Sequence, residues 1–485
     1  MKKKENKTNN KEKDIKIESS NMRKMLIMTI VLCLLHSVLL VYQDLGINVV
    51  LFTIPLLGTI IYFLKENQSI KNKMGLLIII PIILLSATYF VYSNVFNSIN
   101  ILVIPFLYLL LYTVTLDKIK SFVDVFLETI RLIFKPLDYI SSFYKESMKD
   151  LPDGKLSPNT KKVIKSLIIV IPVVIVVLLL LISADQIFGN LFHNFNKIFE
   201  DISFSNILVR IFNFVILFFY LGGTLYFISK KYKDESKEIK ENRVKDPLTI
   251  NILLTTLNVI YIVFDIIQIN SLLLHRVSSG FNYADYARSG FFQLMIISVI
   301  NIVIILLSKK SEEKTYTKIM SLITILLTLI IIVSSFYRMF LYEQAYGYTV
   351  LRLGVYIILI TEVLLFIPTI IFIFKKDFNI LRYYLIIGLS VYSLVNCFSI
   401  DRIIAENNIR RYDRTGDIDI YYLMNNNYDN LDQLRMLSKE LDKDKKIMDM
   451  DKEALKAYIK DMDKNNKYNI LEFNISKEKA KEKRD

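Results

Sequence analysis

Long apolar runs dominate the pattern of hydrophobic and polar positions along the chain. Runs of 17 residues or more recur eleven times, and polar segments separate them. A helix needs about 20 apolar residues to cross a bilayer, and it satisfies its backbone hydrogen bonds internally. The pattern predicts an all-α, polytopic membrane protein with about eleven transmembrane helices, expected at 25–42, 47–64, 75–92, 98–116, 164–183, 207–229, 248–270, 291–308, 319–337, 350–374 and 381–399.

The polar segments predict a division of the chain into five parts. These are a disordered basic cytoplasmic tail (1–24), a four-helix N-terminal transmembrane segment (25–116), a cytoplasmic amphipathic linker (117–163), a seven-helix transmembrane core (164–399) and an extracytoplasmic helical tail (400–485).

Two of these segments carry patterns of their own. The linker mixes aromatic and basic side chains, which suits an amphipathic helix on the cytoplasmic leaflet, broken at Pro136. A packed loop helix is an equally good interpretation. In the tail, Leu431, Leu434, Leu437 and Leu441 recur at near-helical spacing, so helices are expected there.

Basic residues set the expected orientation. Short loops rich in Lys and Arg stay in the cytoplasm, and alternate loops of this chain differ sharply in their content of these residues. The N-terminus is therefore expected inside, and an odd number of spans then puts the tail outside. Outer loops keep only a few basic residues, namely Lys197, Arg210, Arg276, Arg288, Arg338 and Arg352.

The composition agrees with a polytopic membrane protein and excludes several other classes of protein. The 485 residues are 53% hydrophobic and 22% charged, with a mean hydropathy of +0.39, which excludes a soluble enzyme with a single core. The net charge of +14 follows from the topology signal and does not indicate nucleic-acid binding. The lipid bilayer is the expected surrounding of the chain, with an envelope or membrane protein as a further partner.

Cofactor and metal chemistry have little support. Only two cysteines (Cys33 and Cys397) and three histidines (His36, His193 and His275) occur, so neither a disulfide scaffold nor a cysteine-rich zinc site is expected. Phosphate-binding loops, zinc-protease motifs and nucleophile elbows are also missing from the sequence. We therefore predict no cofactor and no metal.

Arginine is used differently from lysine. Nine of the 15 arginines fall in predicted outer segments between residues 205 and 415, and these segments contain no lysine. Guanidinium groups bind carboxylates and phosphates in a planar, bidentate way that ammonium groups cannot reproduce. Either these arginines pin loops through nearby acids such as Glu343 and Glu406, or they form a site for an anionic ligand.

Three polar blocks around these arginines carry a resemblance to a known family. They are the run from Tyr283 to Leu294; Arg338, Tyr342, Tyr346, Gly347, Thr349, Leu351 and Arg352; and Ile404, Ala405, Asn408, Ile409, Tyr412, Thr415, Gly416, Asp419, Tyr422 and Leu423. The chain resembles the bacterial membrane family called domain of unknown function 4173, a relative of family 4153, over about residues 160–480. The terminal segment 468–476 is similar to the family's ending but lacks its usual tryptophans.

The resemblance implies little about activity, because the family has none established. On the residues alone, we predict ligand binding by the 271–290 loop, the 338–352 loop and the start of the tail. The candidate residues are Tyr283, Asp285, Tyr286, Arg288, Arg338, Tyr342, Arg352 and Asn408.

Two carboxylates, Asp265 and Glu362, lie inside predicted spans. Charged residues in a membrane are costly, so a role in a proton or ion relay competes with a hydrogen-bonded structural role. Three functions follow: a non-enzymatic sensor or accessory component with an outer-face recognition site, a secondary transporter of a small anion, or a transferase acting on an envelope substrate. The first has most support, because the blocks are extracytoplasmic and no energy-coupling motif occurs.

Overall fold

The computed structural model describes residues 19–67, 70–93, 95–116, 122–149, 204–229, 247–270, 291–309, 315–375, 378–424, 427–442, 449–466 and 468–482. Regular structure in these residues is helical throughout, so the predicted all-α class is confirmed. The chain forms two compact units. Unit 1 comprises 1–91, 99–234 and 468–475, and unit 2 comprises 92–98, 235–467 and 476–485. These units cut across the five predicted segments, whose boundaries stay a prediction.

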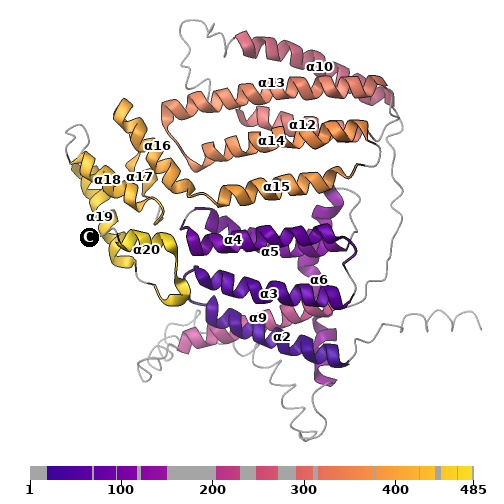
Figure 1. Ribbon diagram of the computed structural model, residues 1–485, viewed down its shortest axis with the longest axis vertical. Helices are drawn as coiled ribbons and strands as arrows, with labels where there is room; N and C mark the ends of the chain where they lie inside the picture. Colours follow the sequence, from indigo (N-terminus) through magenta and orange to yellow (C-terminus); the bar gives the residue numbers. More distant parts are fainter. Residues whose placement is uncertain are drawn as a thin grey trace, which may run out of the picture. The chain divides into compact units, whose positions relative to one another are not determined.

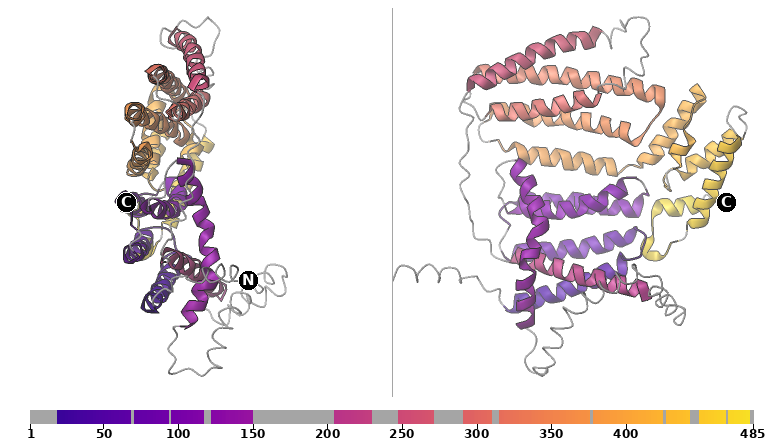
Figure 2. Two further views of the ribbon diagram at one scale, coloured as in Figure 1. Left: turned by 90° about the vertical axis from the view of Figure 1, so that its right-hand side faces the viewer. Right: turned by 180° about the vertical axis from the view of Figure 1, so that it is seen from behind.

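Unit 1 is built from apolar helices that lie side by side, with one helix running across them (Figures 1 and 2). Its elements are α2 (Ser19–Leu39), α3 (Ile47–Glu66), the 3-10 helix η1 (Lys73–Ile78), α4 (Ile79–Val91), most of α5 (Val95–Thr115), α6 (Phe122–Lys149), α9 (Phe204–Ser229) and the short η3 (Ile470–Glu472).

The crossing helix α6 runs through Pro136 without a break. The predicted break is therefore wrong. Two glycines of α9 explain how α6 packs there: a Cβ atom on Gly223 would lie 2.5 Å from the Pro136 carbonyl oxygen, and one on Gly222 would meet the Phe143 ring. Such close approach needs small residues at the helix interface. Leu132 and Phe143 are buried, which favours the packed helix over one lying on a leaflet.

Unit 2 combines a helical bundle with a cap of shorter, more polar helices. The bundle contains α10 (Pro247–Gln268), α12 (Phe291–Ser308), α13 (Thr315–Tyr346), α14 (Val350–Phe374) and α15 (Ile380–Asn396). We define the cap as the α13–α14 turn (347–349) together with α16 (Ile400–Thr415), α17 (Ile420–Leu423), α18 (Leu431–Leu441) and α19 (Asp449–Asn465). The last helix, α20 (Ile475–Glu482), follows it.

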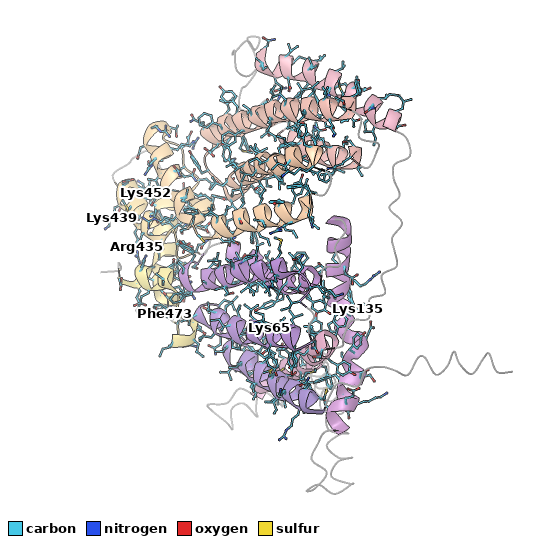
Figure 3. All side chains as sticks on the ribbon, turned by 45° about the vertical axis from the view of Figure 1, so that its right-hand side comes forward. Lys65, Lys135, Arg435, Lys439, Lys452 and Phe473 are labelled. Atoms are coloured by element: carbon cyan, nitrogen blue, oxygen red, sulfur yellow. The ribbon has the colours of Figure 1, made fainter. Side chains whose placement is uncertain are left out.

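The cap has an apolar core of its own. Leu434, Leu437 and Leu441 of α18 are fully buried, and they pack with Ile404 of α16 and Leu455 of α19. The predicted helices of the tail are thus confirmed, because the leucine spacing marks the face that α18 buries. Arg435, labelled in Figure 3, joins α18 to α19 through a 2.6 Å ion pair with Asp463.

Eight helices of the described residues are long and apolar enough to cross a membrane, or nine if α15 and α16 form one span. That pair bends by 63°. Every predicted span within the described ranges has a helix, whereas 164–183 lies outside them. The integral membrane character is therefore confirmed, and the total of eleven spans stays a prediction.

Helix α13 differs most from its prediction. The apolar run ends near residue 337, but the helix continues to Tyr346, so the predicted 338–352 loop is reduced to the turn 347–349. The expected loop is wrong because Arg338 and Glu343 are buried in the last turns of α13 and do not mark its end.

Candidate functional site

The α13–α14 turn requires a glycine. Gly347 has φ +82°, a left-handed conformation that other residues avoid, and its N–H donates to the Glu343 carbonyl oxygen at 2.7 Å. Thr349 then caps α14 by accepting a hydrogen bond from the Arg352 N–H at 3.4 Å. Two members of the second sequence block are therefore needed to reverse the chain direction within three residues.

Asn408 of α16 holds this turn. Its Nδ2 donates to the Tyr348 carbonyl oxygen at 2.9 Å, and its Oδ1 accepts from the Tyr348 N–H at 2.8 Å. Close by, the Tyr422 hydroxyl accepts from the Val350 N–H at 2.9 Å. The second and third sequence blocks, about 60 residues apart, thus come together in the cap.

Two arginines bind the end of α13, where backbone carbonyls have no helical partner. Arg352 lies over the Tyr342 ring at 4.3 Å and donates to the carbonyl oxygens of Tyr346 and Gly347. Arg411 donates from three nitrogens, to Gln344 O (3.1 Å), Ala345 O (2.5 Å) and Asp417 O (3.0 Å). The planar guanidinium groups of both arginines therefore donate hydrogen bonds to backbone carbonyl oxygens of the chain itself.

Other arginines have different partners. Arg402 pairs with Glu406 at 2.8 Å, an ion pair of the kind that the sequence suggested for pinning loops. Buried Arg338 donates to Gln268 Oε1 of α10 at 2.8 Å, and the Ser334 hydroxyl donates to the same oxygen at 2.9 Å. Arg338 thus binds α10 in the bundle, whereas Tyr342 and Arg352 contact each other at the α13–α14 turn.

Glu343 is a member of this site that the sequence named only as an acid near the arginines, not as a candidate site residue. It is buried, and its carboxyl group interacts with the Tyr348 and Tyr356 hydroxyls and with the charge of Arg352. Burial, followed by Glu343, raises the pKa of Tyr348, so this hydroxyl stays a proton donor. The signal that could have identified Glu343 is the buried polar face of α13, which continues beyond the apolar run.

Residues 283–290 of the first sequence block lie outside the described residues, and its last four residues begin α12. Tyr283, Asp285, Tyr286 and Arg288 belong to 283–290, so the proposed contact between Asp285 and Arg288 stays a prediction. Of the eight predicted ligand-binding residues, the turn brings together Tyr342, Arg352 and Asn408.

Within the bundle, α10 and α13 are joined by a ladder of side-chain hydrogen bonds (Figure 1 shows the two helices side by side). Thr317 donates to Asn251 and Thr324 to Asn258, both at 2.7 Å, and Ser334 donates to Gln268. Each rung joins residues 66 apart, so the two helices run in the same direction. Asn251 and Asn258 are seven residues apart, which places them on one helix face.

Asp265 continues this heptad spacing but forms no rung. It is 3% exposed, and neither carboxyl oxygen has a hydrogen-bond partner among the described residues. The residue 66 positions further on is Ile331, which is apolar and buried. Asp265 is therefore a buried carboxyl group without a hydrogen-bond partner among the described residues.

Glu362, the second predicted intramembrane carboxylate, faces α12. Its Oε2 lies 2.6 Å from the Ser298 hydroxyl, and only 3% of the residue is exposed. Further polar contacts link α12 to α10 and to α13, since Tyr261 donates to Asn301 at 2.8 Å and Asn301 donates to Thr328 at 2.9 Å. Polar side chains thus connect α10, α12, α13 and α14 within the bundle.

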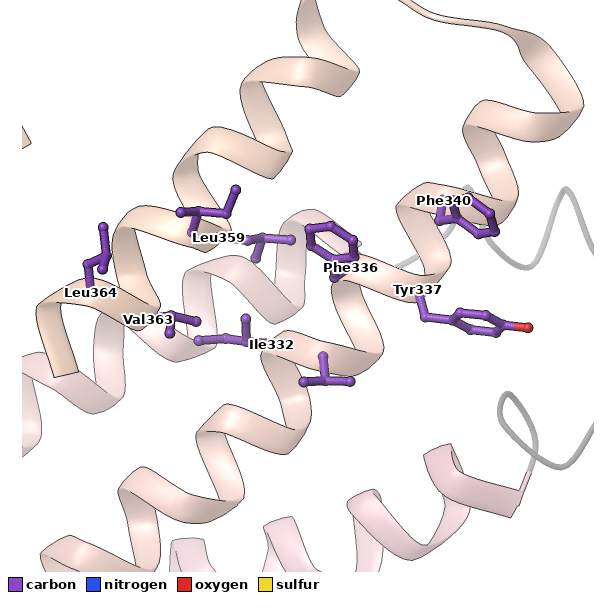
Figure 4. Close-up of a pocket in the computed structure, with 9 residues that line it drawn as sticks. Ile332, Phe336, Tyr337, Phe340, Leu359, Val363 and Leu364 are labelled. Carbon is purple, nitrogen blue, oxygen red and sulfur yellow. The ribbon is translucent and has the colours of Figure 1, made fainter. Parts of the chain in front are cut away.

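A cavity of about 480 Å³ lies between α13 and α14 (Figure 4). Its lining is apolar and aromatic, and includes Phe336, Tyr337, Phe340, Leu359 and Val363. Glu362 is not part of the lining, so this cavity gives no water access to that carboxyl group. Among the residues that the structure describes, no group of three His, Cys, Asp or Glu side chains could hold a metal ion.

The model of the family described as Domain of unknown function (DUF4153) matches residues 79–437, about three quarters of the chain. The chain belongs to the DUF4153 family. This confirms the resemblance at the level of the related family, and membership of family 4173 stays a prediction. No curated protein and no solved structure matches this DUF4153 chain. The match includes α16, α17 and most of α18, so the DUF4153 region extends through most of the cap.

The three hydrogen bonds of the Arg411 guanidinium group predict how a substitution there changes the stability of the DUF4153 cap. Arg411→Lys should lower the free energy of unfolding by roughly 1–2 kcal/mol, because one ammonium nitrogen cannot occupy three separated acceptors. Arg414→Lys is the matched control: Arg414 is exposed and donates to Arg410 O at a long 3.4 Å, so the change should be under about 0.5 kcal/mol. Thermal unfolding in detergent measures both, and equal effects would contradict the assignment.

Proposed function

We propose that this DUF4153 protein is a non-enzymatic component of a bacterial plasma membrane, a sensor or an accessory of an envelope system. Its N-terminus lies in the cytoplasm, and the cap lies on the extracytoplasmic side. There the cap recognises a membrane or envelope protein through its exposed end.

The observation that carries this proposal is the meeting of the second and third sequence blocks in one rigid cap. Asn408 and Arg411 fix the α13–α14 turn to α16, and Tyr422 fixes α17 to the same turn. The end of α16 then presents Arg410, Asp413 and Arg414, all exposed. Exposed charges on a rigid support suit recognition of a macromolecule, since the arrangement loses little freedom on binding.

Contacts within unit 1 support the expected sidedness. Residues of the terminal segment bind the connection between α2 and α3: Asn469 donates to Gln43 at 2.6 Å, and the Ile47 N–H donates to Phe473 O at 3.0 Å. Because α2 crosses the membrane once, this connection and the start of α2 lie on opposite sides. These contacts support a terminal segment on the side opposite the start of α2, as an odd number of spans predicts.

Site-specific photo-crosslinking in intact cells tests recognition. A photoreactive amino acid at Arg410 or Arg414 should form a discrete protein adduct, and the same probe at exposed Asp138 of α6 should not form it. Arg411→Ala, which frees the turn, should reduce the yield at Arg414. No adduct at either cap position, or the same adduct at Asp138, would contradict the proposal.

A second candidate is a secondary transporter of a small anion. The observation in its favour is the polar contact set of the bundle, together with the buried carboxyl groups Asp265 and Glu362. Reconstituted protein should then carry an anion-dependent proton flux into liposomes, and Glu362→Gln should abolish that flux at normal membrane abundance. If wild-type liposomes show no flux, the transporter proposal is wrong and the recognition proposal is the one that remains.

A further inference from the structure

Glu362 lies in a chain of three oxygen atoms between α14 and α12. Its Oε2 is 2.6 Å from Ser298 Oγ, and the same Oγ is 2.7 Å from the backbone carbonyl oxygen of Met295. Both distances are within the range of O–H···O hydrogen bonds. Ser298 is therefore close enough to form a hydrogen bond with each of its two neighbours.

The number of available protons decides which atom is the donor in each of these two hydrogen bonds. A serine hydroxyl has one proton to donate, and both a carboxylate and a carbonyl oxygen can only accept. An ionised Glu362 would leave two acceptors competing for the single Ser298 proton. If Glu362 carries a proton, it donates to Ser298 Oγ, and Ser298 donates to Met295 O. Both contacts then hold a hydrogen atom.

The local backbone favours the second arrangement. Serine within a helix commonly donates to the carbonyl three or four residues earlier, and Met295 is three residues before Ser298. The Ser298 proton is thus directed along α12, and the oxygen lone pairs face α14. The only available donor for those lone pairs in the contact is the Glu362 carboxyl group.

Charges that could stabilise an ionised Glu362 are not in contact with it. No charged side chain of the described residues interacts with its carboxyl group. Helix α12 has no ionisable residue, and the buried Arg338 and Glu343 of α13 are engaged by Gln268 and by Tyr348 with Tyr356. On α15, Arg382 lies in the first turn. The other Glu362 oxygen, Oε1, is buried with no partner in this part of the chain.

We infer that Glu362 is a proton-binding site of the bundle, which keeps its proton on Oε2 at neutral pH and donates it to Ser298. The ligand of this site is the proton itself. Loss of the proton would leave an unpaired carboxylate between α12 and α14, so occupancy of the site controls the contact of these two helices. This inference goes beyond recognition at the cap and does not depend on it.

Infrared spectroscopy of the full-length protein in lipid at pH 7 tests the site. The difference spectrum between wild type and Glu362→Gln should show loss of a carbonyl band of a protonated carboxylic acid. The matched control is Glu406→Gln, which removes a carboxylate paired with Arg402 and should remove carboxylate bands while leaving the acid carbonyl band unchanged. Loss of carboxylate bands in Glu362→Gln would overturn the inference.

Ser298→Ala provides an independent measurement if Glu362→Gln does not accumulate. It keeps the acid but removes the acceptor, so the acid band should shift to the frequency of a carboxyl group without a hydrogen bond. In wild type, labelling glutamate with ¹³C at the carboxyl should shift the same band. An acid band that Ser298→Ala leaves unmoved would overturn the donation to Ser298. A label-insensitive band would overturn the assignment to glutamate. Neither result bears on crosslinking at the cap.

Discussion

Gly347→Ala should be among the most destabilising single changes in unit 2, lowering the free energy of unfolding by roughly 2–5 kcal/mol. An alanine at φ +82° costs about 1–2 kcal/mol in backbone strain. In addition, the new Cβ would lie 2.5 Å from Asn408 Oδ1, so Asn408 must move and release the Tyr348 backbone. Buried backbone groups without partners cost about 1–3 kcal/mol.

Two other glycines are matched controls for that measurement. Gly416 also has a positive φ, +75°, but nothing lies within 4 Å of its added Cβ, so only the backbone cost of about 1–2 kcal/mol should appear. Gly354 lies inside α14 with open space, so alanine there should stabilise the helix by about 0.5–1 kcal/mol. Thermal unfolding followed by circular dichroism should rank the three in this order, and equal losses at 347 and 416 would refute the role of Asn408.

Asp265→Leu is expected to change stability in the opposite direction. Neither oxygen of Asp265 has a partner in the described bundle, and burial of an unpaired polar group costs about 1–3 kcal/mol in proteins. Leucine removes that cost and packs near Ile331 and Tyr261, so the free energy of unfolding should rise by roughly 1–3 kcal/mol.

Asn258 is the matched control for Asp265, one heptad earlier on the same helix. Asn258→Leu removes the bond from Thr324 and the bond to the Met320 carbonyl, so it should lower stability by roughly 1–2 kcal/mol. Unfolding of both variants in mild detergent measures the contrast. If Asp265→Leu destabilises the protein as much as Asn258→Leu, Asp265 has a partner that the ladder does not account for.

The spans and the tail helices could be predicted from the sequence because each buries a face with a simple repeat. Leu434, Leu437 and Leu441 show this for α18. The end of α13 could not be predicted in this way, because hydropathy treats Arg338 and Glu343 as the start of a loop. Tertiary partners, including Gln268 on another helix, permit these residues to be buried.

Some of the residues that meet at the α13–α14 turn could be singled out from the sequence, but their contacts could not, and their role in ligand binding stays a prediction. Tyr342, Arg352 and Asn408 were identified from polar blocks, whereas the pairing of Asn408 with Tyr348 joins positions 60 apart and depends on how α16 packs. The arginines Arg352 and Arg411 bind backbone carbonyls, an acceptor that sequence composition does not display. The ladder between α10 and α13 has a clearer signal in the sequence. Asn251 and Asn258 are seven residues apart, and so are their partners Thr317 and Thr324.

The cap can recognise an envelope partner only if it lies outside the cytoplasm, and thiol labelling of intact cells tests this most directly. In a background with Cys33 and Cys397 replaced by serine, a cysteine at Ser438 of α18 should react with a membrane-impermeant thiol reagent. A cysteine at Ser236, in a predicted inner segment, should react only after the membrane is permeabilised. Labelling of Ser236 but not Ser438 in intact cells would contradict the proposed orientation and an extracytoplasmic role for the cap.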